Sequence, residues 1–150
     1  GQLCQEDRLA LLAPGEGGGR ARGESPREPA KPEPAAWTTV EEWALGPGAG
    51  RRYARASGDY NPVHLWSWSA RLLGYRRPIL HGFCLEAMAT HALVRQCLGG
   101  DPTALRRLLL RFRSPLLLPA RVALQVTGTR LRVVDAERER KPYAVGEWVG

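Results

Sequence analysis

The sequence predicts an α+β domain in which one long helix packs on one face of an antiparallel β-sheet. Residues 81–100 carry apolar side chains at steps of three and four, the period of an amphipathic helix. From residue 104 onward, alternating and β-branched segments are separated by Pro, Gly and charged clusters, a pattern typical of three or more antiparallel strands. A long helix followed by a run of strands is the order of elements in an α+β domain.

The composition is that of one basic, globular domain. The 150 residues suffice for a single core, and no run approaches the ~18 apolar residues of a membrane helix, so we expect no membrane span. The net charge is +7, and because residues 1–36 hold five basic and six acidic side chains, residues 37–150 carry +8. This charge favours an anionic partner: nucleic acid, an acidic carrier protein or a phosphate-bearing cofactor tail. The chain has no aromatic-interleaved basic stretch, zinc-finger spacing or helix-turn-helix, so we expect no nucleic acid partner.

The three cysteines, Cys4, Cys84 and Cys97, are odd in number and widely spaced. They form no CxxC pair and no Cys/His set with the spacing of a metal site, so we expect no metal. Unpaired cysteines fit a reduced, cytoplasmic setting, in which Cys84 and Cys97 serve as small buried apolar residues.

The first 36 residues differ from the rest in composition. Residues 13–36 are built from Gly, Pro, Glu, Arg and Ala with no apolar period, which predicts a disordered linker. Residues 1–12 end in the short apolar group LALL, and we expect either the remnant of a preceding domain or an unstructured N-terminus. Residues 37–150 then form the domain.

Two short elements precede the long helix. Threonines at 38–39 followed by acids at 41–42 resemble a helix start, and after a Gly/Pro turn we expect a short helix or strand through Tyr53. Residues 66–75, WSWSARLLGY, have the apolar spacing of a short helix that Gly74 stops.

The long helix should turn one apolar face toward the sheet. Gly99 and Gly100 end it. The predicted apolar face comprises Leu85, Met88, Ala89, Ala92 and Leu93, and the small residues that let the sheet approach closely are Ala87, Ala89 and Ala92.

A polar cluster follows Gly58. This glycine permits a backbone conformation closed to other residues, and Asn61-Pro62 predicts a turn that brings Asp59 and His64 to the same side. A carboxylate beside an imidazole can hold one water and share its proton, as general acid-base catalysis requires. Each residue also has a structural interpretation, Asp59 as a turn-forming residue and His64 as a packed or surface histidine.

Gly82 stands where the long helix begins. A glycine at a helix N-terminus offers a backbone N–H and the positive end of the helix dipole, with no Cβ to obstruct a carbonyl, which outlines an oxyanion hole. These parts together predict a reaction in which water or a proton moves next to a carbonyl. His81 has a second interpretation as a helix cap, and we expect His91 to be structural.

Residues 53–70, YARASGDYNPVHLWSWSA, and residues 77–83, RPILHGF, resemble the MaoC-like dehydratases, the group that includes the (R)-specific enoyl-CoA hydratases. The resemblance covers about residues 48–119 well and the strands beyond them loosely. It implies a hot-dog fold, in which an antiparallel sheet wraps a long central helix, and paired hot dogs with acyl-thioester sites near the pairing surface. The linker and the single motif resemble the C-terminal half of a double hot-dog protein, so we expect a homodimer or pairing with a second hot dog.

The resemblance implies a role for each site residue. Asp59 and His64 match the residues that bind and activate the water added across a trans-2-enoyl thioester. The N–H of Gly82 matches the group that polarises the thioester carbonyl. The supporting residues that it implies are Ser57 and Asn61, which hold the loop, and Thr90, whose hydroxyl orients the acid.

The resemblance also implies a set of substrate-binding residues: Arg76, Arg77, His81, Phe83 and Trp66. Position 66 is often acidic in relatives, and the tryptophans at 66 and 68 either line an acyl tunnel or pack the short helix. The arginines at 71, 76 and 77 either meet the phosphates of CoA or the acidic face of an acyl carrier protein, or form a solvated basic surface.

The implied activity is that of a hydro-lyase of fatty acid metabolism, the reversible hydration of trans-2-enoyl-CoA to (R)-3-hydroxyacyl-CoA. The substrate is a thioester of CoA or of acyl carrier protein phosphopantetheine, and no further cofactor is expected. Two alternatives share the fold, a hot-dog thioesterase and a non-catalytic acyl-CoA-binding or partner subunit. A basic nucleic-acid-binding module is a third, and salt-sensitive binding would support it.

Overall fold

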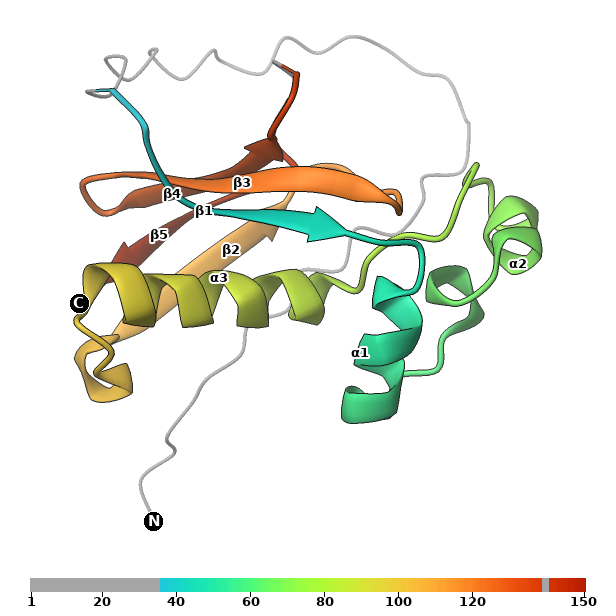
Figure 1. Ribbon diagram of the computed structural model, residues 1–150, viewed down its shortest axis with the longest axis horizontal. Coiled ribbons are helices and arrows are strands. Elements are labelled where there is room, and N and C mark those ends of the chain that lie inside the picture. The colour runs from blue at the N-terminus through green and yellow to red at the C-terminus, as the bar shows by residue number, and fades with distance from the viewer. Residues whose placement is uncertain (1–35, 139–140) are drawn as a thin grey trace, which may run out of the picture. The chain divides into compact units, whose positions relative to one another are not determined.

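The computed structural model describes residues 36–138 and 141–150. The predictions for residues 1–12 and for the linker up to residue 35 lie outside the described residues, as does Cys4. The described elements follow one another in this order (Figure 1): β1 (Thr38–Leu45), α1 (Ala49–Ser57), the 3-10 turn η1 (Pro62–His64), α2 (Ser67–Leu72), α3 (Gly82–Cys97), the 3-10 turn η2 (Pro102–Ala104), β2 (Arg107–Phe112), β3 (Ala120–Thr127), β4 (Arg130–Asp135) and β5 (Ala144–Val149).

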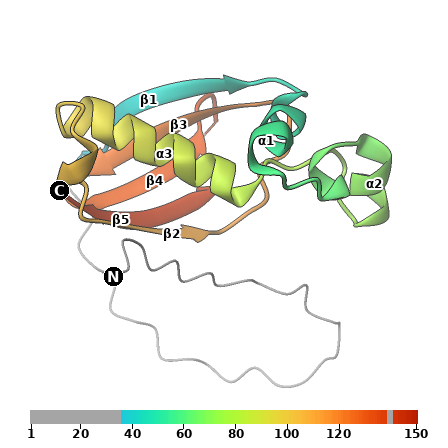
Figure 2. The ribbon, with the colours of Figure 1, turned by 90° about the horizontal axis from the view of Figure 1, so that it is seen from below.

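The strands form one five-stranded antiparallel sheet in the order β1-β3-β4-β5-β2. Strands β1 and β2 are therefore the edges of the sheet that the described residues form. Helix α3 crosses one face of this sheet (Figure 2). The predicted α+β domain, with a long helix on an antiparallel sheet, is confirmed.

The core lies between α3 and the sheet. Leu85, Ala89, Ala92 and Leu93 are buried, and Met88 packs at the border of the same cluster, so the predicted apolar face is confirmed. Because apolar area removed from water is the main stabilising term in folding, this contact fixes α3 on the sheet. The sheet contributes buried side chains to this cluster from its inner face, among them Val122, Leu124, Leu131, Val133 and Ala144.

Three side chains of α3 depart from the prediction. Ala87 is exposed, so only the other two predicted small residues bring helix and sheet together. Cys97 was expected to be buried and is exposed, because it is the last residue of α3 and no further turn covers it. Cys84 is half-buried rather than buried, near the start of the helix.

The residues at 38–39 open a strand and not a helix. Strand β1 pairs with β3 along its length, and this pairing with a distant segment outweighs the local helix signal. The short element through Tyr53 is the helix α1, and α2 followed by Gly74 (φ 84°) matches the predicted short helix and its stop. No helix in residues 36–138 or 141–150 is both long and apolar enough to cross a bilayer.

The elements between β1 and α3 lie beyond one end of the sheet, beside the N-terminal end of α3 (Figure 2). The chain returns from α2 to the sheet end through a bridge between Ile79 and Leu117. Next to it the N–H of Leu118 donates to the carbonyl oxygen of Pro78 at 2.8 Å. On its other side the segment contacts the loop that carries the predicted site, because the N–H of Ile79 donates to the carbonyl oxygen of Val63 at 3.3 Å.

Candidate active site

Helix α1 ends at Gly58, whose φ of 78° turns the chain out of the helix. The N–H of Gly58 donates to the carbonyl oxygen of Ala54 at 2.9 Å and closes the last turn. A positive φ is costly for a residue with a side chain and easy for glycine, as the sequence predicted for this position. Asp59 therefore leaves the helix in a fixed direction.

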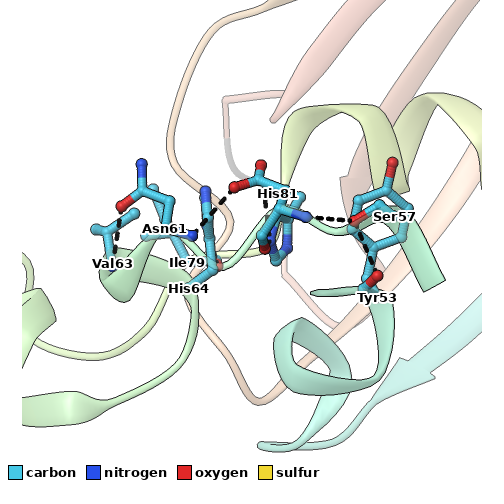
Figure 3. Close-up of polar contacts among 8 residues, drawn as sticks. Tyr53, Ser57, Asn61, Val63, His64, Ile79 and His81 are labelled. Carbon is cyan, nitrogen blue, oxygen red and sulfur yellow. Dashed lines mark hydrogen bonds and ion pairs between the residues drawn. The ribbon is translucent and has the colours of Figure 1, made fainter. Parts of the chain in front are cut away.

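A chain of short-range hydrogen bonds holds the loop around Asp59 (Figure 3). The Ser57 hydroxyl donates to the carbonyl oxygen of Tyr53 at 2.9 Å and accepts the N–H of Asp59 at 3.2 Å. Asp59 Oδ1 accepts the N–H of Asn61 at 3.1 Å, and Asn61 Oδ1 accepts the N–H of Val63 at 3.3 Å. Asp59 is thus a turn-forming residue, but its side chain is still 48% exposed and Oδ2 faces His81 at 3.9 Å.

His64 closes the 3-10 turn η1 and points back toward the segment before α3. Its Nδ1 lies 2.9 Å from the carbonyl oxygen of Ile79. Because a carbonyl can only accept, Nδ1 carries the hydrogen and Nε2 is left as a proton acceptor. Burial lowers the pKa of His64 and the neighbouring His81 lowers it further, against the hydrogen bond to Ile79 and the charge of Asp59, which raise it. His64 is therefore a neutral imidazole near pH 7.

His81 is buried, with 2% of its surface exposed, and lies between the loop and α3. Its Nε2 lies 3.1 Å from the backbone carbonyl oxygen of Asp59, to which it donates, and its ring stacks on His64 with centroids 3.8 Å apart. The Tyr53 ring also packs against the His81 ring, with the two ring centroids 4.8 Å apart. His81 occupies the N-cap position of α3, as its second interpretation had it, but its side chain makes no capping bond.

Asp59, His64 and His81 converge. One carboxylate oxygen and one ring nitrogen from each histidine lie within 4.8 Å of one another. Two groups that each bond the same water at about 2.8 Å stand roughly 4.5 Å apart, so this spacing suits one shared water. A carboxylate that can accept and a neutral imidazole with a free acceptor nitrogen could orient such a water and take its proton.

The same three residues fit a metal ion less well. A zinc ion would lie about 2.0–2.1 Å from each ring nitrogen, along a lone pair in the plane of the ring. The rings of His64 and His81 are stacked with an interplanar angle of 26°, so their in-plane lone pairs run side by side and do not meet at one point. The Nε2 of His81 is also engaged with the carbonyl oxygen of Asp59.

Gly82 is the first residue of α3, where a backbone N–H has no carbonyl one turn earlier to bond. The helix that follows has 16 residues, and its positive end adds to the attraction for an oxyanion. The glycine also has a packing role that the sequence did not predict. A Cβ at this position would lie 3.2 Å from the ring of Phe112 on β2, so the missing side chain makes room for this ring.

Thr90 is not brought to Asp59. Its hydroxyl donates to the carbonyl oxygen of Glu86 at 2.9 Å, one turn back in the same helix. His91 is exposed on α3. The predicted link between Thr90 and the acid has no counterpart among the contacts of the described residues.

The predicted substrate-binding residues do not share one surface, and His81 among them is buried. Phe83, beside the site on α3, is 47% exposed. Trp66 is 44% exposed and stacks on Trp68 at 6.1 Å, so the two tryptophans pack on each other at the surface of α2. Arg76 is exposed near the end of α2, whereas Arg77 lines a groove of about 920 Å³ at the sheet end, together with Arg121, Asp135, Glu137, Arg138, Lys141 and Tyr143.

Two residues that hold the site were missed from the sequence. Tyr53 supports both Ser57 and His81, and its place one helical turn before Ser57 within the matched run could have indicated this. Gly50 lies in α1 so close to His64 that a Cβ there would overlap the carbonyl oxygen of His64. No local signal marked Gly50, because the contact joins two separate elements.

The candidate site is thus a cluster of Asp59, His64 and His81 beside the N-terminal end of a helix that lies on an antiparallel sheet. A family model described as MaoC like domain matches residues 24–147, and the chain belongs to this family. The solved MaoC-like dehydratase from Phytophthora capsici superposes with a TM-score of 0.67 at 29% identity over 92% of this chain and 47% of that one. The (R)-hydratase from A. caviae involved in PHA biosynthesis superposes with a TM-score of 0.63 at 22% identity, over 80% and 96% of the two chains. These neighbours confirm the hot-dog fold.

Curated relatives include hydratases and dehydratases. The 3-hydroxyacyl-thioester dehydratase Y of Mycobacterium tuberculosis is 38% identical over 122 residues, 77% of this chain and 40% of that protein. The peroxisomal enoyl-CoA hydratase 2 of Arabidopsis thaliana is 47% identical over 58 residues, 39% of this chain and 19% of that protein. This chain thus spans less than half the length of either relative.

Proposed function

We propose that this domain catalyses the reversible hydration of a trans-2-enoyl thioester to an (R)-3-hydroxyacyl thioester. The observation that carries the proposal is the convergence of Asp59, His64 and His81 within 4.8 Å at the mouth of α3. Membership of the MaoC-like family and the names of the relatives support the reaction class.

The water is held between Asp59 and the Nε2 of His64. One of the two accepts a proton as the water oxygen forms a bond to C3 of the enoyl group. The electrons of the double bond move toward the thioester, whose carbonyl oxygen becomes enolate-like beside the N–H of Gly82 and the positive end of α3. A proton is then delivered to C2, so that one water has been added and no other reactant is consumed.

His81 and Tyr53 are positioning residues in this scheme. His81 donates to the backbone carbonyl of Asp59 and stacks on His64, so it couples the acid and the imidazole in one packed unit. Tyr53 packs on His81 and anchors Ser57, which in turn accepts the N–H of Asp59. Both catalytic groups therefore depend on contacts that reach back into α1.

The thioester carrier is CoA or an acyl carrier protein, and no other cofactor takes part. The phosphates common to both carriers would meet basic side chains in the groove that Arg77 lines. Arg138 and Lys141 line the same groove, together with the acids Asp135 and Glu137. The site works in a pair of hot dogs, either two copies of this chain or this chain and a second domain.

The direct test is to supply a series of trans-2-enoyl thioesters, on CoA and on carrier protein, and to follow loss of the enoyl absorbance and release of free thiol together. Hydration removes the absorbance and releases no thiol, and chiral analysis should find the (R)-alcohol. Release of thiol in step with substrate loss would show a thioesterase instead. Tight binding of an acyl-CoA without turnover would favour the non-catalytic subunit.

A further inference from the structure

Helix α2 buries small side chains and exposes large apolar ones. Its buried residues are Ser69 and Ala70, and the Ser69 hydroxyl donates to the carbonyl oxygen of Pro62 at 2.6 Å, which ties α2 to η1. Trp68 and Leu72, four positions apart and so on one face of the helix, are 63% and 79% exposed. A helix that packs only on its own domain turns its large apolar side chains inward, so this reversed pattern indicates a binding surface.

Neighbouring residues extend this surface. Trp66 stacks on Trp68 with the ring centroids 6.1 Å apart, and the exposed Leu73 directly follows the helix. Most of the large apolar side chains that are exposed in the described residues lie between residues 60 and 73. Together with two adjacent arginines they form what we call the α2 patch: Trp66, Trp68, Arg71, Leu72, Leu73 and Arg76.

The charge of the α2 patch is positive. Arg71 and Arg76 are exposed, and with Gly74 and Tyr75 they line a shallow hollow of about 470 Å³. Residues 60–80 contain three arginines and no aspartate or glutamate. Within the part of the chain that the structure describes, no ion pair joins Arg71 or Arg76 to an acid. Two guanidinium groups beside one hollow fit a phosphate, since each can donate two parallel hydrogen bonds to it.

The place of α2 in the domain leaves the α2 patch accessible. Both ribbon views show α2 beyond one end of the sheet, as the outermost described element there (Figure 1, Figure 2). It belongs to neither edge of the sheet, since β1 and β2 occupy those positions. A flat surface could therefore approach the α2 patch without first meeting the sheet.

We infer that the α2 patch binds the surface of an anionic phospholipid membrane without crossing it. The tryptophans and leucines enter the boundary between headgroups and acyl chains, where an aromatic ring with a polar N–H is favoured. The two arginines bind lipid phosphates and are attracted by the negative charge of the surface. This inference stands apart from the proposed reaction and uses none of its catalytic groups.

Three other occupants fit the α2 patch less well. A tunnel for a single acyl chain encloses that chain, whereas Trp68 and Leu72 are mostly exposed. A stable protein interface takes about 20–30 residues a side, and the α2 patch has six. Nucleic acid bases stack on free aromatic faces, but the two tryptophan rings stack on each other and the remaining apolar members are leucines.

Flotation of the full chain with phospholipid vesicles tests the inference. Each arginine near an anionic surface contributes on the order of a fivefold gain in binding. Vesicles of phosphatidylcholine with roughly one third phosphatidylserine should therefore bind the protein on the order of tenfold or more tightly than phosphatidylcholine alone, and salt should weaken this binding. Brominated acyl chains in the same vesicles should quench the tryptophan fluorescence, because Trp66 and Trp68 enter the bilayer.

Substitutions of the apolar members locate the contact. Leu72→Gln and Trp68→Ala should each weaken vesicle binding by about fivefold or more, since each removes apolar area that the bilayer would cover. Leu109→Gln is the matched control, because it makes the same leucine substitution at an exposed position on β2, and it should bind as wild type.

Substitutions of the arginines test the choice of lipid. Arg71→Gln/Arg76→Gln should remove most of the preference for phosphatidylserine. Arg107→Gln/Arg111→Gln makes the same change in net charge at exposed positions on β2 and should keep the preference. All of the substituted side chains are exposed, so thermal unfolding should find every variant folded.

A wild-type chain that floats with neither kind of vesicle would overturn the inference. Equal losses in the β2 controls would also overturn it, because binding would then follow net charge and not the α2 patch. So would binding of a short RNA or of polyglutamate that the α2 variants lose, in the absence of vesicle binding. The vesicles carry no thioester, so an active hydratase that does not float would remove only this inference.

Discussion

Substitution of Gly50 by alanine should move His64. Gly50 is buried in α1, and a Cβ built there overlaps the carbonyl oxygen of His64, well inside the 3.0 Å below which real Cβ atoms are essentially never found. The neighbour is backbone, so it cannot rotate aside as the end of a side chain could. The segment carrying His64 must shift by on the order of 1 Å, and a misplacement of this size costs about a hundredfold in rate.

Whether Gly50→Ala stabilises or destabilises the protein also tests the contact between α1 and His64. Glycine to alanine within a helix normally stabilises by up to ~1 kcal/mol. Overpacking against a fixed neighbour costs about 1–3 kcal/mol, and the His64–Ile79 hydrogen bond is strained as well. We expect Gly50→Ala to lower the free energy of unfolding by about 2 kcal/mol and the melting temperature by roughly 8 °C or more.

The assay pairs kcat/KM for enoyl-thioester hydration with thermal unfolding, and Gly46→Ala is the matched control. A Cβ at Gly46 meets nothing within 4 Å, and its backbone has no positive φ. The control should stay within about 0.5 kcal/mol of wild type and keep its activity. A Gly50→Ala variant as stable and as active as the control would refute the packing of α1 on the His64 carbonyl.

Three further predictions concern His64, Ser57 and the pairing of β5 with β2. Burial holds the pKa of His64 below 6.5, so His64 is still mostly neutral at pH 6.5. The fall of kcat/KM on the acid side should therefore have its midpoint below pH 6.5, and a midpoint above 6.5 would contradict this. Ser57→Ala removes the acceptor for the N–H of Asp59 and should lower kcat/KM about tenfold at a stability cost of about 1 kcal/mol, whereas Ser57→Thr keeps the hydroxyl and should behave as wild type in both measurements. Gly146→Ala puts a Cβ into the carbonyl oxygen of Leu109 and forces β5 from β2, so chemical denaturation should find a loss of about 3 kcal/mol or more; a stable variant would mean that the two strands do not pack as described.

Much of the fold is local enough to be predicted from the sequence. The period of residues 85–93 identified α3 and its buried face, since burial follows the helical period within one element. The strand at 38–45 was not identified, because it is made by pairing with β3 near the other end of the chain. Cys97 follows the helical period but lies at its end, where the period no longer determines burial.

The candidate site was also predictable only where its contacts are local in the sequence. The turn from Gly58 to His64 is built from short-range bonds and could be predicted as a unit. The stacking of His81 on His64 and the support from Tyr53 join separate elements, and sequence spacing gives no such distance. Thr90 was predicted to contact Asp59, but its hydroxyl donates to the carbonyl oxygen of Glu86 within α3.

The central claim is that Asp59 and His64 activate water, and the rates of crotonyl-CoA hydration by Asp59→Asn and His64→Ala test it most directly. Asn at 59 keeps an oxygen for the Asn61 N–H, and the side chain it replaces is 48% exposed, so this variant should melt close to wild type. We expect each substitution to lower kcat by about 10²–10⁴-fold with the fold retained. Folded variants that both hydrate crotonyl-CoA at close to the wild-type rate would contradict the account.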